Sequence, residues 1–306
     1  MSKVIRKIML AVPGLRQLVL IVDALAKISE TLTEIRNEIA KLPATQASQQ
    51  QEHGFSQSQR YQDPKRLLSS AFKIHSQNGE DGMIAEIFRR IGQTSKVFIE
   101  IGVADGRECN SAFLLACGWR GCWIDSGREM NDVFKKQGTS VRDRLTTVTA
   151  MVSAENIGSI LETQKTAKEF DFLSIDIDQN TYYIWKALSG YSPRVVVVEY
   201  NPLLPAAIDW KVNYAPDRVW DGSKNYGASL MALERLGLEL GYNLVGCDYS
   251  GTNAFFVRAD LVGSHFATPF TADNHYEPAR LVTPPVRFHK TELLDWPTAD
   301  PVSNEA

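Results

Sequence analysis

The strongest constraint on the fold is an alternation of short apolar segments with longer polar or helical ones across residues 97–199. Strands that are apolar along their whole length are typical of a parallel sheet covered by helices on both faces. The apolar segments are Val97–Ile101, Cys122–Asp125, Leu145–Thr149, Phe172–Asp176 and Val195–Glu199. We therefore predict an α/β fold built on a mostly parallel sheet.

Two further apolar segments lie close together near the end of this region. Tyr242–Gly246 and Ala254–Val257 flank a short turn-rich sequence that contains Gly251. This arrangement predicts a β-hairpin, which would add an antiparallel strand to the sheet. Helical spacing of apolar residues predicts helices over 80–91 and 230–240.

The beginning of the chain carries a heptad repeat, whose core positions would be Leu18, Ile21, Leu25, Ile28, Leu32, Ile35, Ile39 and Leu42. Leucine at one core position and isoleucine at the other favour a coiled coil of three or four chains, so we expect a homo-oligomer. The alternative is an amphipathic helix that packs on its own domain. A third interpretation is a peripheral membrane contact through a basic helix that contains Lys3, Arg6 and Lys7.

Composition divides the rest of the chain. Residues 43–63 include seven glutamines and few aliphatic side chains, which is typical of a flexible linker. From Val262 a Pro-rich sequence predicts a poorly ordered or surface-draped tail. We predict a helix or coiled coil over 1–43, a linker over 44–65, the main folded domain over 66–262 and a tail over 263–306.

Charge and cysteine content argue against several classes of protein. The net charge of -3 provides no basic field for nucleic acid. The four cysteines lack the spacing of a zinc site or a disulfide framework, which favours a reducing compartment. Pro13, Arg16 and Asp23 interrupt the first apolar stretch, which is shorter than the roughly 20 residues that a membrane span needs. We therefore expect a cytoplasmic protein.

The turn after the first predicted strand has the pattern ExGxxxG, formed by Glu100, Gly102 and Gly106, with Asp105 inside it. Glycines are needed where the backbone reverses tightly beneath a ligand. The acids and the missing middle glycine make this turn a poor site for a pyrophosphate. A cationic ligand fits better, and S-adenosylmethionine carries both a sulfonium and an amino group.

Asp125 ends the second predicted strand, 19 residues beyond Gly106. An acid at this place in a nucleotide-binding sheet hydrogen-bonds the ribose hydroxyls. Asp125 is followed by Ser126 and Gly127, so the N-cap of the next helix is the alternative role.

These features resemble the class I S-adenosylmethionine-dependent methyltransferases, and more narrowly an FkbM-like bacterial group that methylates glycans and natural products. The resemblance extends over about residues 72–261. The residues that carry it are Ser76–Asp81, Phe98–Gly102, Gly118–Gly121, Trp123–Asp125, Ser174–Asp178, Val198–Asn201 and Gly227–Leu230.

The resemblance implies a Rossmann-like sheet of seven strands in the order 3-2-1-4-5-7-6, with strand 7 antiparallel, and S-adenosylmethionine as cofactor. The segment 66–262 would then be the methyltransferase domain. Gln77 and Ser126, in or beside the matching motifs, join the predicted cofactor-binding residues. Gln179 departs from the pattern, because a glycine is expected after the two aspartates.

Four oxygen-bearing side chains follow the fourth and fifth predicted strands, namely Asp176, Asp178, Glu199 and Asn201, and we predict that they are catalytic. The five histidines lie outside the strand-end motifs, so a histidine base is not indicated. Asp176, Glu199 and Asn201 would suit Mg²⁺ or Ca²⁺, which lowers the pKa of an acceptor hydroxyl. The alternatives are that Asp176 contacts the methionine amino group, Asp178 caps the next helix and Glu199 forms an ion pair.

The insertion 202–225 is rich in aromatic and polar residues, and we interpret it as a lid over the methyl acceptor. Its aromatic rings suit a sugar, although loop packing alone would also explain them. The predicted activity is methylation of a hydroxyl on a sugar, glycan or natural product. The alternatives are an NAD-dependent oxidoreductase or epimerase and a non-catalytic scaffold.

Overall fold

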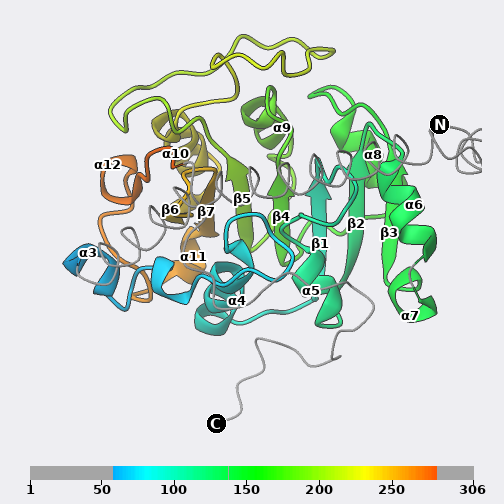
Figure 1. Ribbon diagram of the computed structural model, residues 1–306, viewed down its shortest axis with the longest axis horizontal. Helices are drawn as coiled ribbons and strands as arrows, with labels where there is room; N and C mark the ends of the chain where they lie inside the picture. The colour runs from blue at the N-terminus through cyan, green and yellow to red at the C-terminus, as the bar shows by residue number, and fades with distance from the viewer. Residues whose placement is uncertain (1–57, 137, 281–306) are drawn as a thin grey trace, which may run out of the picture. The chain divides into compact units, whose positions relative to one another are not determined.

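The computed structural model describes residues 58–136 and 138–280, which contain seven strands. The strands are β1 (Val97–Ile101), β2 (Arg120–Asp125), β3 (Leu145–Thr149), β4 (Phe172–Ile175), β5 (Val195–Glu199), β6 (Tyr242–Cys247) and β7 (Asn253–Arg258). They form one sheet in the order β3-β2-β1-β4-β5-β7-β6 (Figure 1). β7 is antiparallel to both of its neighbours, while the other pairs are parallel. The predicted strand order and hairpin are therefore confirmed.

Helices connect the parallel strands and flank the sheet (Figure 1). They are α3 (Gln59–Gln62), the 3-10 helix η1 (Leu68–Ser70), α4 (Glu80–Ile91), α5 (Ala112–Ala116), α6 (Glu129–Lys136), α7 (Thr139–Arg142), α8 (Ile157–Thr163), α9 (Thr181–Ala187), α10 (Leu230–Glu239), α11 (Ala259–Val262) and α12 (Ala272–His275). α4 and α10 lie where the apolar spacing predicts helices. Within the described residues, no helix is both long and apolar enough to cross a membrane.

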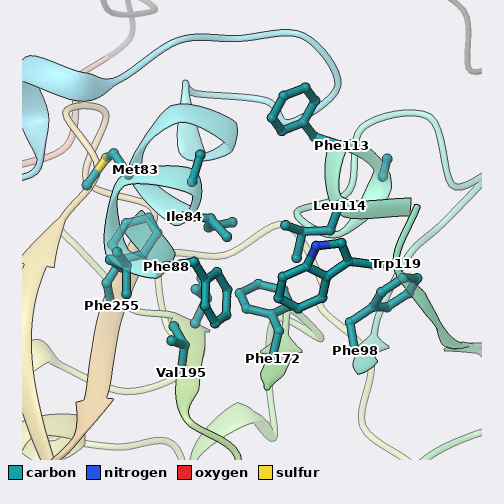
Figure 2. Packing of buried hydrophobic residues seen from close by; sticks show 14 of the residues in the cluster. Met83, Ile84, Phe88, Phe98, Phe113, Leu114, Trp119, Phe172, Val195 and Phe255 are labelled. Atoms are coloured by element: carbon teal, nitrogen blue, oxygen red, sulfur yellow. The ribbon is translucent and has the colours of Figure 1, made fainter. Parts of the chain in front are cut away.

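Alternate residues of each central strand enter two separate hydrophobic cores, because successive side chains in a strand point to opposite faces. Phe98 packs in one core with Phe88 of α4 and Leu114 of α5, whereas Ile99 packs in the other with residues of α8, α9 and α10. Figure 2 shows the first core, where the rings of Phe88 and Trp119 lie 4.8 Å apart. Burial on both faces explains why the strands are apolar along their whole length.

The described structure extends beyond the predicted domain at both ends. Phe266 is only 1% exposed, and Ala272 and His275 of α12 are buried as well. Arg60 of α3 forms an ion pair of 2.9 Å with the buried Glu277. Residues 263–280 are thus packed against the domain and not draped over it, and part of the predicted linker packs with them. The predicted coiled coil, most of the linker and residues 281–306 lie outside the described residues.

Candidate active site at the carboxyl ends of the strands

A cavity of about 580 Å³ lies at the edge of the sheet where the parallel strands end. The loops after β1, β2, β3 and β4 contribute to its wall, together with Gln77 and residues of the β5–α10 loop. That loop, yellow-green in Figure 1, crosses the end of the sheet from which α9 leaves. Of the predicted site residues, the cavity is lined by Gln77, Gly102, Asp105, Asp125, Ser126, Asp176 and Asp178.

The two glycines of the turn after β1 make room for protein neighbours. Gly102 has φ of +85°, and a Cβ there would lie 1.6 Å from the carbonyl oxygen of Asp176. Gly106 has φ of +79°, and a Cβ there would lie 2.5 Å from the ring of Trp123. Close packing of adjacent strand ends therefore requires both glycines, whether or not a ligand is bound.

Glu100 lies behind the turn and does not line the cavity. Its buried carboxylate accepts hydrogen bonds from the backbone N–H of Asn110 at 2.7 Å and of Ser111 at 2.9 Å, and from the Ser111 hydroxyl. Burial raises the pKa of Glu100, and these hydrogen bonds oppose the shift. In this structure Glu100 holds the chain that leads into α5, so it shapes the turn from behind.

Asp125 lines the cavity and also fixes its wall. One carboxylate oxygen accepts from the backbone N–H of Ala104 at 2.8 Å, and the other accepts from that of Gly127 at 2.7 Å. A carboxylate can accept about four hydrogen bonds, so each oxygen retains capacity for a ligand hydroxyl. The hydrogen bond from Gly127 closes a local turn just before α6. This role resembles the predicted alternative, in which Asp125 caps that helix.

Asp176, which lines the cavity, and Glu199, which lies behind it, form a pair of carboxyl groups. Asp176 is partly exposed to the cavity, and Glu199 is buried. Burial raises the pKa of Asp176 to about 7, and the neighbouring Asp178 adds to the shift. Burial and the charge of Asp176 raise the pKa of Glu199 well above its usual range. The two side chains hydrogen-bond each other, and each carboxylate disfavours ionisation of the other.

Asp178 lines the cavity from an unusual backbone conformation, with φ of +57°. Within 58–136 and 138–280, no hydrogen bond to its carboxylate is recorded, and burial raises its pKa. Asn180, not Asp178, is the N-cap residue of α9. The turn has its left-handed residue at Asp178 and not at Gln179, where the family pattern has glycine. Aspartate tolerates this conformation better than most residues. Gln179 therefore need not be glycine.

Asn201 joins the β5–α10 loop to the sheet and does not line the cavity. Its side-chain nitrogen donates to the carbonyl oxygens of Lys224 and Tyr226, both at 3.0 Å. Its side-chain oxygen accepts from the backbone N–H of Leu203 at 3.1 Å. The amide is buried and both of its N–H donors are used, so Asn201 closes the base of the loop.

The metal site predicted from Asp176, Glu199 and Asn201 stays a prediction, because one of its three ligands would be an amide oxygen that already accepts a hydrogen bond from Leu203. Burial and mutual repulsion raise the pKa of both Asp176 and Glu199, and a bound cation would favour their ionised forms. Across the described ranges, no group of three or more His, Cys, Asp or Glu side chains could hold a metal ion.

The β5–α10 loop is held on both sides of the part that lines the cavity. On one side, Asn180 donates to the carbonyl oxygen of Ala215 at 2.8 Å, and the Tyr183 hydroxyl donates to that of Val212 at 2.8 Å. On the other side, Asn201 holds residues 224–226. Between these anchors the loop places four residues on the cavity wall, which are Pro216, Arg218, Val219 and Trp220.

Sequence reasoning missed the contribution of the loop after β3, where Ala150, Met151 and Val152 line the cavity. It also did not single out Val103 and Arg107 in the turn after β1. The position of these residues directly after predicted strands was the available signal, because loops at the carboxyl ends of parallel strands surround the ligand crevice.

No protein-family model matches the chain, and no curated protein matches its sequence. Solved structures similar to it include several methyltransferases. The glycopeptide N-methyltransferase MtfA has 12% identity and a TM-score of 0.36, covering 62% of this chain and 95% of its own. An O-methyltransferase from Bacillus cereus in complex with SAH has 16% identity and a TM-score of 0.38, covering 60% of this chain and 82% of its own.

The O-methyltransferase TomG from Streptomyces achromogenes, in complex with SAM, has 22% identity and a TM-score of 0.32. The match covers 42% of this chain and 59% of TomG. Similarities with identities and TM-scores this low do not identify the activity. The activity is therefore inferred from the geometry of the cavity.

Proposed function

We propose that this protein is an S-adenosylmethionine-dependent methyltransferase that methylates a hydroxyl group of a sugar, glycan or natural product. The observation that carries the proposal is the cavity of about 580 Å³ at the strand ends, into which the loops after β2 and β4 bring carboxylates. Its volume is within the range of small-molecule sites, roughly 300–1,000 Å³. The sugar-like acceptor is inferred from the aromatic residues of the β5–α10 loop.

The residues present fit this cofactor. The carboxylate of Asp125 would accept from the ribose hydroxyls, since both its oxygens retain capacity beyond their backbone bonds. Val103, Met151 and Val152 offer an apolar surface to the adenine ring. Asp176 would bind the amino group of the methionine part, because a cation nearby favours its ionised form.

Charge separates this cofactor from the dinucleotide alternative. Asp105, Asp125, Asp176 and Asp178 all line the cavity. They would repel the pyrophosphate of NAD and attract a sulfonium and an ammonium group. With Glu108, the wall carries five acidic side chains against the two arginines Arg107 and Arg218, so its charge supports the methyltransferase over the oxidoreductase.

The cofactor, when bound, supplies a methyl group on a positively charged sulfur. An acceptor hydroxyl must lose its proton as its oxygen bonds to that methyl carbon. Asp178 is the residue placed to take this proton, because it faces the cavity with an unpaired carboxylate of raised pKa. Its backbone N–H donates to Glu199, which makes Glu199 a positioning residue. The lid residues Val219 and Trp220 would exclude water from the reacting atoms.

Thermal unfolding of the full chain tests the proposal. S-adenosylhomocysteine should raise the melting temperature, and NAD should not, because only a ligand that binds the folded state stabilises it. Asp125→Asn should reduce the shift, whereas Asp132→Asn, on the exposed face of α6, should leave it unchanged. The proposal fails if S-adenosylhomocysteine gives no shift. Binding without any methyl transfer to a panel of acceptors would favour the non-catalytic scaffold.

A further inference from the structure

The cavity wall carries positive as well as negative side chains, and the proposed cofactor, whose only anionic group is the carboxylate of its methionine part, does not account for both arginines. The acids follow the strand ends, whereas Arg107 and Arg218 come from the loops after β1 and β5. Arg107 is 61% exposed and lies 3.7 Å from the carboxylate of Asp105. Glu108 lines the same part of the wall. Arg107 is thus paired with an acid, whereas Arg218 interacts with Asp221 without a described ion pair, so Arg218 is the stronger candidate for binding an anion.

Hydrogen bonds of the β5–α10 loop fix the backbone at Arg218. Its backbone N–H donates to the carbonyl oxygen of Ala215 at 3.1 Å, and that oxygen also accepts from Asn180, another residue of the cavity wall. Within the described part of the chain, no ion pair or side-chain hydrogen bond is recorded for its guanidinium. The backbone of Arg218 is therefore fixed at the cavity wall, and the donors of its guanidinium remain available, with Asp221 near enough to feel its charge.

Trp220 lies two residues further along the same wall and is 49% exposed. Its indole N–H donates to the carbonyl oxygen of Ser223 at 2.8 Å, and its ring lies 6.1 Å from that of Tyr226. The indole is thus held in place while part of its surface stays free. Tryptophan rings in such positions pack against the apolar faces of ligands.

We propose that the methyl acceptor carries a negatively charged group, a carboxylate or a phosphate, which Arg218 binds with support from Arg107. The Trp220 ring packs against the part of the acceptor that bears this group. The planar guanidinium donates two parallel hydrogen bonds to either anion, so both share one recognition chemistry. This inference rests on the proposed function, because the acceptor must share the cavity with the cofactor.

Isothermal titration of the full chain saturated with S-adenosylhomocysteine tests the inference with three probes: glucuronate, glucose 6-phosphate and methyl glucoside. At least one anionic probe should bind, and the neutral glycoside should bind much more weakly or not at all. Arg218→Ala should weaken that binding by roughly tenfold or more, since a charge-assisted hydrogen-bond pair is lost. Lys224→Ala removes the same charge from the same loop outside the cavity wall and should change affinity by less than about twofold.

Comparison of glucuronate with glucose 6-phosphate shows which anion the site prefers. Equal binding of either anionic probe by wild type and Arg218→Ala would overturn the inference, as would methyl glucoside binding as tightly as the anions. The titration of S-adenosylhomocysteine into Arg218→Ala is a separate readout and should match wild type. If wild type itself fails to bind S-adenosylhomocysteine, the proposed function fails, and the probes are then titrated into the unliganded protein under the same criteria.

Discussion

At the scale of single residues, the carboxyl pair of Asp176 and Glu199 has the clearest chemical consequence. The pKa of Asp176 is about 7 in the folded protein against an ordinary value of 3.8. Between these pH values the folded state binds a proton that the unfolded state has released. This pair therefore makes stability decrease as pH rises through that window. A cation that binds the ionised carboxylate offsets this cost.

We therefore expect the affinity for S-adenosylhomocysteine to increase as pH rises toward 7 and to level off above it, because its amino group binds ionised Asp176. Titration calorimetry below and above pH 7 measures this dependence. Glu199→Gln should move the midpoint to lower pH, since the amide donates a hydrogen bond and cannot carry a second negative charge. An unchanged midpoint in that variant would show that Glu199 does not control Asp176.

Asp178 gives a separate prediction about the reaction. Asp178→Asn keeps the shape and tolerates the left-handed backbone, but it removes the proton acceptor. It should lower kcat by roughly 10²–10⁴-fold with a methyl acceptor found among the anionic compounds, and change the affinity for S-adenosylhomocysteine far less. The measurement is transfer of a labelled methyl group. Wild-type turnover by Asp178→Asn would remove Asp178 from the catalytic residues.

At the scale of elements, the turn after β1 is shaped by its neighbours. Gly102→Ala places a Cβ 1.6 Å from the carbonyl oxygen of Asp176 and requires a left-handed alanine. We expect it to lower the free energy of unfolding by about 2–4 kcal/mol, measured by urea denaturation. Gly158→Ala in α8 is the control, because its Cβ meets nothing within 4 Å, and it should be neutral or stabilising by up to about 1 kcal/mol.

The β5–α10 loop shows a second effect at this scale. Asn201 follows a strand whose last residue is acidic, and its amide would suit a metal as well as it suits a loop. The loop role depends on where residues 224–226 return to the sheet, because their carbonyl oxygens accept from both N–H donors of the amide. That return brings together residues more than 20 positions apart, which local sequence does not reveal.

At the scale of the whole molecule, both ends of the described chain belong to the domain. Phe266→Ala should destabilise the protein by about 3–5 kcal/mol, since a buried ring is replaced by a cavity. Leu238→Ala, at a position that is 53% exposed, should change stability far less. Urea denaturation of both variants measures the difference. Equal effects would mean that the segment after β7 contributes little to the core.

The oligomeric state is the second prediction at this scale, and it rests on the heptad repeat of residues 18–42. Leu25→Asp together with Leu32→Asp should give monomers, because two charges would enter the core of a coiled coil. Asn37→Asp adds a charge at an outer heptad position and should leave the assembly intact. Light scattering of the full chain measures the mass. An unchanged mass in the double variant would refute a coiled-coil assembly.

The sequence by itself determined the α/β class, the strand order through a family resemblance, and the placing of acids at the edge where the strands end. These features follow from burial on both faces of the sheet and from the common direction of parallel strands. Only the tertiary structure decided which acids line the cavity. Asp125, Asp176 and Asp178 reach it, whereas Glu100 is used by backbone N–H groups.

Tertiary structure also decided the role of segments far apart in the chain. Residues 263–280 pack on the domain because the polar groups of Glu277 find partners in Arg60 and Tyr61, about 216 positions earlier. The same holds for Arg218, which reaches the cavity because Asn180 and Asn201 hold the loop on either side of it. Hydrogen bonds between distant residues depend on how the chain returns to itself, and neither composition nor spacing records that path.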